Sequence, residues 1–232
     1  MNRDHTQRAV DVSLRILRVG ATWLVVDKPS GFLSVPGRVQ HDSVVNRVRA
    51  AYPLARGPIA PHRLDMDTSG VMVCALTPEA HRHISIQFQE RKVAKRYHAL
   101  LAAPIDRPSE GLIDLPMRLD VERRPYQIVD LAQGRSAQTR YRILEVRPHT
   151  TPDGRSMEAA LVEFEPITGR SHQLRVHSAD PRGLGAPILG DDLYAGDHAH
   201  SAPRLMLHAS MLAFDDPETG ERVEITSSAS FA

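Results

Sequence analysis

The sequence predicts an α+β fold, built around a mainly antiparallel, mixed β-sheet that is flanked by helices and loops. Two observations support this prediction: apolar, β-branched stretches outnumber stretches with helical periodicity, and short turns rather than regular crossover helices separate most of them. The chain has 232 residues, of which 41% are hydrophobic, and can therefore bury a sizeable core. We expect one domain over residues 1–232, with its core at about 14–228.

The first expected elements are two strands and a helix. Residues 14–17 and 22–26 are apolar and β-branched, and the second stretch stops at the turn residues 27–31. Residues 43–52 carry three valines at helical spacing, behind Ser43, which can cap the helix. We therefore expect the order strand, strand, loop and helix.

A buried strand at 71–76 and a helix at about 78–91 are expected next. Thr77 supplies an N-cap and Pro78 suits the first helical position. Further strand-like stretches are expected at 96–101, 138–146, 158–164 and 173–176. Residues 102–133 are rich in proline, glycine and charge, which indicates an exposed excursion from the sheet that could touch a partner.

Charge and composition restrict the class of protein. The formal net charge is only +1, so local basic patches rather than a global field must hold any polyanion. The single cysteine, Cys74, excludes a disulfide within the chain and lies in an apolar stretch typical of a buried side chain. No segment approaches the roughly 20 apolar residues that span a bilayer, and the polar start resembles no signal peptide. We expect a soluble cytoplasmic protein with no membrane association and no obligate protein partner.

The most unusual segment is the polar loop at 61–70, which ends in a glycine directly before a buried strand. Arg63 precedes Asp65, and a nearby guanidinium would keep a shielded carboxylate ionised, as a nucleophile or base requires. Two other interpretations stay open. Asp65 and Asp67 could merely cap the turn, or they could hold a divalent metal beside a nucleotide-sugar, although no further ligands are spaced nearby.

A second constellation lies at 166–177, where a glycine-containing turn leads into polar and basic residues. If residues 173–177 are extended, their alternate side chains share one face. Arg175 could then pair with a carboxylate, while Arg170 and His172 contact phosphates or base edges. The alternative is an exposed turn followed by a charged strand face.

A third feature places four cations within residues 91–96, in front of Tyr97. Cations suit phosphates, and an aromatic ring suits an unstacked base. The alternative is a solvated helix end in which Arg91 and Lys92 complement the helix dipole and Tyr97 is part of the core. Gly-x-Gly-x-x-Gly, Walker-type and Gly-x-Ser-x-Gly motifs do not occur, so we expect no nucleotide cofactor and no hydrolase triad.

Together these segments resemble the RluA family of pseudouridine synthases over nearly the whole chain. The segments His-Arg-Leu-Asp (62–65) and Gly-Arg-Ser-His-Gln-Leu-Arg-Val-His (169–177), in that order and at that separation, are highly specific. The other matching segments are 27–31, 33–37, 95–97, 111–116, 187–191 and 203–209.

The resemblance implies a pseudouridine synthase catalytic fold without an S4-like RNA-binding module, and a reaction that needs neither cofactor nor metal. It implies that Asp65 is the catalytic aspartate, that Tyr97 stacks on the target uracil and that Arg175 pairs with the aspartate. It also suggests that Arg63 enters the space vacated by the flipped nucleotide. The residues that we expect to contact RNA are His62, Arg63, Lys95, Arg96, Arg170, His172 and Gln173.

The expected substrate is structured RNA, because flipping a uridine out of its stack costs least in a loop. RluA-like enzymes act on a tRNA anticodon stem-loop and on 23S rRNA, and we expect the same RNAs here. One departure from the family is Asp67, which stands where alanine is common and adds a second carboxylate. The competing hypotheses are a metal-dependent glycosyltransferase that uses Asp65 and Asp67, and a non-catalytic RNA-binding domain.

Overall fold

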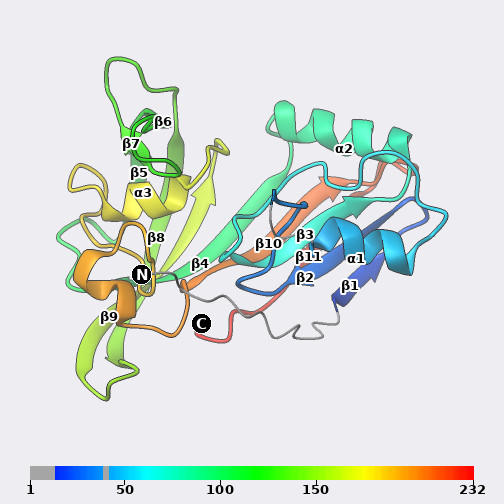
Figure 1. The fold of residues 1–232 in the computed structure, drawn as a ribbon. Coiled ribbons are helices and arrows are strands. Elements are labelled where there is room, and N and C mark those ends of the chain that lie inside the picture. Colours follow the sequence, from blue (N-terminus) through cyan, green and yellow to red (C-terminus); the bar gives the residue numbers. More distant parts are fainter. Residues whose placement is uncertain (1–13, 39–41) are drawn as a thin grey trace.

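The computed structural model describes residues 14–38 and 42–232 (Figure 1). Its strands are β1 (Arg15–Val19), β2 (Trp23–Lys28), β3 (Ser69–Ala75), β4 (Ala94–Ala102), β5 (Glu110–Asp114), β6 (Met117–Leu119), β7 (Gln127–Val129), β8 (Gln138–Thr150), β9 (Ser156–Pro166), β10 (Leu207–Asp215) and β11 (Arg222–Thr226). Its helices are α1 (Val44–Ala51), α2 (Pro78–Gln89), α3 (Gln173–Ala179) and the 3-10 helix η1 (Gly196–His200).

One long sheet organises the molecule. Its strand order is β1-β2-β3-β10-β4-β9-β8-β5, and β11 also pairs with β10. Among the described strands, neighbours pair antiparallel except β3 and β10, which run parallel. Every residue of β3 and nearly every residue of β10 is buried, as expected for strands that are covered on both faces. The predicted α+β class with a mainly antiparallel sheet is confirmed.

Helices α1 and α2 cover opposite faces of the sheet near β2. Successive side chains of a strand point to opposite faces. Leu24 and Val26 accordingly pack in one core cluster with Val48 of α1, while Val25 packs in another with Ile84 of α2. This arrangement leaves the loop between α1 and β3 at the end of the sheet, where it borders the cleft described below.

The predicted helix starts are confirmed. The Ser43 side chain accepts a hydrogen bond from the backbone N–H of Asn46 at 3.3 Å, and Thr77 accepts one from Ala80 at 3.2 Å. Pro78 is the first residue of α2, where its missing N–H costs no helical hydrogen bond. The predicted burial of Cys74 is also confirmed.

The strand predicted at 173–176 is wrong, because these residues form helix α3. The residue before the helix, His172, has left-handed backbone angles (φ 54°, ψ 18°), which turn the chain out of the extended path. Gln173 then donates to Gln138 O and Thr139 Oγ1 of β8. The alternation of residue types that suggested a strand is misleading here. Residues 173–178 are all buried, so this helix has no exposed side whose polar residues would recur with the period of a helix.

The stretch at 102–133 divides into two parts. Strand β5 pairs with β8 and belongs to the main sheet. Strands β6 and β7 form a separate hairpin that projects away from the sheet (Figure 1). The predicted excursion is therefore confirmed for the β6–β7 hairpin and wrong for β5. Among the described residues, no helix is long and apolar enough to cross a membrane.

Candidate active site

The loop that carries Asp65 is fastened to the sheet by buried side chains from the segment after β2. Lys28 is fully buried, and its ammonium group donates to Met66 O at 2.7 Å. Ser34 Oγ donates to Leu64 O at 2.6 Å and accepts from Leu64 N at 3.1 Å. The backbone on both sides of Asp65 is therefore held by donors that water cannot easily replace.

Charge is concentrated around this loop. Burial lowers the pKa of Lys28 to about 7, while the negative charges of Asp67 and Asp65 oppose that shift. The pKa of Asp67 is raised, first by burial and then by the negative charge of Asp192, with a smaller contribution from Asp65. Asp67, the second carboxylate of the loop, is therefore harder to ionise than a free aspartate, because it is buried and lies near other carboxylates.

Asp65 borders a cleft of about 1040 Å³, shared by its own loop, the end of α2, strand β4, the β6–β7 hairpin and the start of α3. The expected site residues that line the cleft are His62, Arg63, Asp65, Lys95, Tyr97, Arg170, His172, Gln173 and Arg175. Arg96 lies outside it and sits 3.8 Å from the carboxylates of Glu163 and Glu224. Alternation along β4 explains the difference, because Lys95 and Tyr97 point to the opposite face from Arg96.

Tyr97 forms an apolar wall of the cleft. Its ring packs against two core clusters, which fixes its position on β4. Burial raises the pKa of its phenol, and the negative charge of Asp65 raises it further. Tyr97 therefore stays protonated and presents a neutral aromatic face beside Asp65.

Arg175 does not pair directly with Asp65, contrary to the expectation from the sequence. It makes a bidentate ion pair with Asp191, with Nε–Oδ2 and Nη2–Oδ1 distances of 2.8 and 2.5 Å, and Nη2 is 2.9 Å from Asp192 Oδ1. The Arg175 and Asp191 side chains are 3% and 0% exposed. The negative charge of Asp65 still contributes to the raised pKa of Arg175. The two side chains therefore attract each other electrostatically without a direct ion pair.

Two histidines of the cleft are engaged within the protein. His62 Nε2 accepts from the backbone N–H of Val73 at 3.1 Å, and its ring stacks on Phe88 with centroids 4.5 Å apart. Burial lowers its pKa to about 3, and the charge of Lys95 adds to that shift. His172 Nδ1 lies 2.7 Å from the hydroxyl oxygen of Tyr194. Burial lowers the pKa of His172 as well, so both rings are neutral at pH 7.

Gln173 lines the cleft, but its polar groups are bound within the fold. Its Oε1 accepts from Thr168 Oγ1 at 2.7 Å and from Arg170 N at 2.9 Å. Its Nε2 makes two donations to β8, so its hydrogen-bonding capacity is used. In this conformation the side-chain amide of Gln173 has no hydrogen-bonding group left for the expected contact with RNA. Gln173 instead stabilises the turn before α3.

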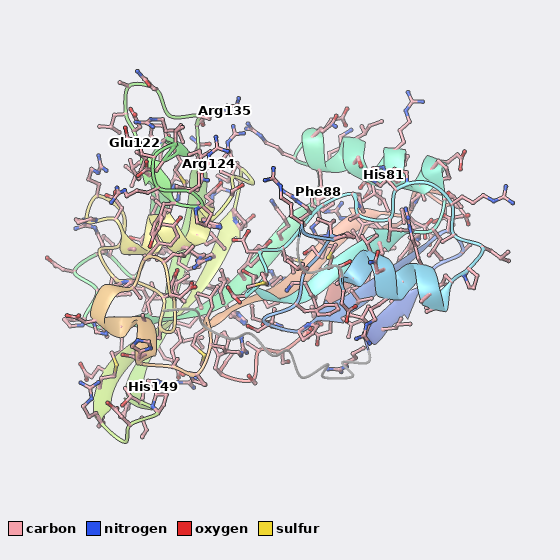
Figure 2. All side chains as sticks on the ribbon, viewed as in Figure 1. His81, Phe88, Glu122, Arg124, Arg135 and His149 are labelled. Carbon is pink, nitrogen blue, oxygen red and sulfur yellow. The ribbon has the colours of Figure 1, made fainter. Side chains whose placement is uncertain are left out.

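Exposed cations surround the cleft. Arg63, Arg91, Arg124 and Arg170 line it, and none has an acidic partner within 4 Å in the part of the chain that the structure describes. Figure 2 shows Arg124 on the hairpin side and Phe88 on the α2 side of the molecule. Guanidinium groups without an acidic partner on both sides of a cleft suit a polyanion that lies across it, and Arg170 keeps its charge available although its Nε donates to Ser136 O at 3.0 Å.

Sequence reasoning missed Asp191 and Tyr194. Asp191 belongs to a segment that matches the family, but nothing in its local pattern indicates that it holds Arg175. Tyr194 accepts from the backbone N–H of Gln127 and lies with its ring 5.3 Å from the Arg175 guanidinium. Among the described residues, no group of three or more His, Cys, Asp or Glu side chains is placed to hold a metal ion.

Comparisons with known proteins show which family the chain resembles. The sequence profile of the family described as RNA pseudouridylate synthase matches residues 22–180. The chain is 46% identical over 211 residues to the dual-specificity RNA pseudouridine synthase RluA of Escherichia coli K12, covering 90% of each chain. It is 39% identical over 224 residues to the protein of the same name from Pasteurella multocida, covering 95% of each. The solved structure of human RNA Pseudouridylate Synthase Domain Containing 1 superimposes with a TM-score of 0.77 at 30% identity, covering 95% of this chain and 85% of that one.

Proposed function

Since the chain belongs to the RluA family of RNA pseudouridine synthases and isomerises uridine to pseudouridine in RNA, we propose that Asp65 is its catalytic residue. The observation that supports this assignment is that Asp65, Tyr97 and Arg175, from distant parts of the sequence, border one cleft. We further propose that residues 1–232 act as one catalytic domain with its core at about 14–228. The glycosyltransferase and binding-only hypotheses receive no support from the relatives.

The reaction explains why these three side chains are needed together. The bond between C1′ and uracil N1 breaks, the detached ring turns, and C5 bonds to C1′. C5 then loses its proton to a base, and the freed N1 takes up a proton, so that the product is an isomer of the substrate. A carboxylate held at the sugar, Asp65, can act in these steps as nucleophile or base. Tyr97 provides a flat wall for the turning ring, and Arg175 supplies positive charge that its pair with Asp191 keeps in place.

The proposed substrates are a tRNA anticodon stem-loop and 23S rRNA, which would place the enzyme in the cytoplasm. The relatives are named dual-specificity enzymes, which supports two kinds of RNA substrate, and the choice of these two RNAs rests on the resemblance to the RluA family. A uridine in a loop flips out at a cost of only a few kcal/mol. Arg63, Lys95 and Arg170 border the cleft where the flanking nucleotides would lie, and we assign them to phosphate contacts or to the gap left by the flipped base.

The experiment measures tritium release from RNA labelled at uracil C5, with an anticodon stem-loop and a 23S rRNA fragment as separate substrates. We expect release from both RNAs by the wild type and a loss of roughly 10³-fold or more in Asp65→Asn. Asp67→Asn is the matched control, because it removes a carboxylate two residues away, and we expect it to keep most activity. Equal rates for Asp65→Asn and wild type would refute the catalytic assignment, and release from one RNA alone would refute the dual substrate.

A further inference from the structure

His172 combines a strained backbone with a fixed side chain at the edge of the cleft. Its backbone is left-handed, a conformation that costs energy in residues other than glycine and that is often kept for function. Its Nδ1 lies 2.7 Å from Tyr194 Oη, and the two rings meet edge to face with centroids 5.7 Å apart. The hydrogen bond and the edge-to-face ring contact with Tyr194 together fix the orientation of the imidazole.

The hydrogen bonds of Tyr194 favour one tautomer of the imidazole. The Tyr194 hydroxyl oxygen accepts from the backbone N–H of Gln127 at 2.8 Å, and among the described residues its single hydrogen has no acceptor other than His172 Nδ1, so donation to Nδ1 is the arrangement that satisfies both groups. Nδ1 is then an acceptor, and the proton of the neutral ring is on Nε2.

The surroundings of His172 keep the ring neutral. Its pKa is lowered, mainly by burial and also by the positive charge of Arg175. The carboxylates of Asp65, Asp191 and Asp192 act in the opposite direction and do not reverse the shift. A neutral imidazole with one fixed N–H is a directional hydrogen-bond donor rather than a cation.

The donor is accessible from the cleft. His172 lines the cleft, and its Nε2 has no hydrogen-bond partner among the described residues. The side-chain nitrogen and oxygen atoms that are buried without a partner in that part of the chain belong to Thr22 and His98, so His172 Nε2 is open to solvent. The charge of Asp65 acts on His172, which indicates that donor and carboxylate border the same space.

We propose that the Nε2–H group of His172 donates a hydrogen bond to a carbonyl oxygen of the target uracil, and that Tyr194 is the positioning residue that sets this tautomer. The proposal rests on the proposed function. When the bond between C1′ and N1 breaks, its electron pair stays with the uracil, and the negative charge spreads over the ring nitrogen and the two carbonyl oxygens. A preorganised neutral donor stabilises that charge as it develops.

The first test reads the tautomer in the free enzyme by NMR of ¹⁵N-labelled histidine, with the His172 signals identified by their loss in His172→Asn. We expect a protonated Nε2 and a hydrogen-bonded, unprotonated Nδ1. Tyr194→Phe keeps the ring that meets Tyr126 edge to face at 5.7 Å and removes only the hydroxyl, so we expect a mixture of tautomers. A wild-type His172 that is protonated at Nδ1 would overturn the proposal, whatever the activity shows.

The second test compares His172→Gln with His172→Asn in the tritium-release assay. Glutamine places an amide nitrogen near the position of Nε2, whereas asparagine fits the left-handed backbone but reaches only the position of Nδ1. We expect glutamine to retain most of the activity, and asparagine to fold stably yet lose about 10²-fold in kcat with little change in KM. Equal activities would overturn the proposal, and a rise in KM alone would assign His172 to a phosphate instead.

These outcomes are separable from a failure of the proposed function. If wild-type enzyme released no tritium from either RNA, the proposed substrates would fail while the NMR test still decided the tautomer. If wild type were active and the asparagine variant equally so, the proposed function would stand and the role of His172 would fall.

Discussion

The two walls of the cleft are held by different kinds of interaction. The loop wall (residues 61–70) is fastened by buried donors, as shown by the contacts of Lys28 and Ser34 with its backbone. The hairpin wall (residues 117–129) relies on more exposed ion pairs, Arg118 with Asp130 and Arg123 with Asp120, and on a small apolar cluster. Buried hydrogen bonds fix a position far more firmly than surface ion pairs do.

This difference matches the two tasks that we propose for the cleft. The proposed catalytic role of Asp65 requires a precisely placed carboxylate, and the buried donors of the loop wall suit that requirement. A surface that contacts phosphates tolerates movement, because such contacts depend on charge more than on direction. Tyr194 joins the two sides, since it contacts Gln127 of the hairpin as well as His172 and Arg175.

The largest effect is expected from removing the donor beneath the loop wall. Lys28→Met leaves the carbonyl oxygens of Pro29, Phe32 and Met66 without their ammonium donor, and we expect the free energy of unfolding to fall by about 3 kcal/mol. Arg118→Met is the matched change on the hairpin wall and should cost less than about 1 kcal/mol. Urea unfolding of both variants measures the contrast, and similar losses would contradict it.

A second effect is expected from pH and is smaller over a single pH unit. It comes from His62 of the loop wall, and other histidines whose pKa is lowered by burial, such as His177 and His208, add to it. The folded state keeps His62 neutral down to about pH 3, whereas the unfolded chain binds a proton near the ordinary pKa of 6.5. The free energy of unfolding should therefore fall as pH drops below about 6.5, by up to about 1.4 kcal/mol per unit. His62→Gln should flatten this dependence in urea unfolding at several pH values.

The control for this pH dependence is His200→Gln, a change at an exposed histidine. It should leave the slope of the free energy of unfolding against pH as in the wild type. An unchanged slope in His62→Gln would show that His62 does not anchor the loop as a neutral acceptor. The hairpin wall contains no histidine, and its paired carboxylates Asp120 and Asp130, whose pKa values are lowered by hydrogen bonds from Arg123 and Arg118, affect stability only in the more acidic range where carboxylates titrate, below about pH 4.

The smallest effect is expected from single cations of the hairpin wall. Arg124→Gln removes an exposed cation of the cleft, and should weaken RNA binding a few-fold and reduce the slope of log K against log salt by about 1. Arg123→Gln is the neighbouring control, because Arg123 is already paired with Asp120 at 2.8 Å and should change the slope less. Fluorescence anisotropy in an Asp65→Asn background measures both without conversion of the RNA, and equal slopes for the two variants would refute a special role for Arg124.

The sequence by itself determined the features that depend on neighbouring residues. Ser43 and Thr77 cap their helices through backbone groups three residues away, so both helix starts were predictable. The apolar stretches that became β2, β3 and β4 predicted a sheet, and the resemblance of the loop at 61–70 to the family made Asp65 the candidate catalytic carboxylate. Each of these depends on the chemistry of a short segment.

Only the tertiary structure decided the features that join distant segments. Residues 173–177 alternate like a strand, yet the bonds of Gln173 to β8 and the left-handed His172 begin a helix there. Arg175 takes Asp191 as its partner rather than Asp65. The chain pattern contains no sign of either outcome, because a buried polar group takes the partner that the packed fold brings within hydrogen-bonding distance.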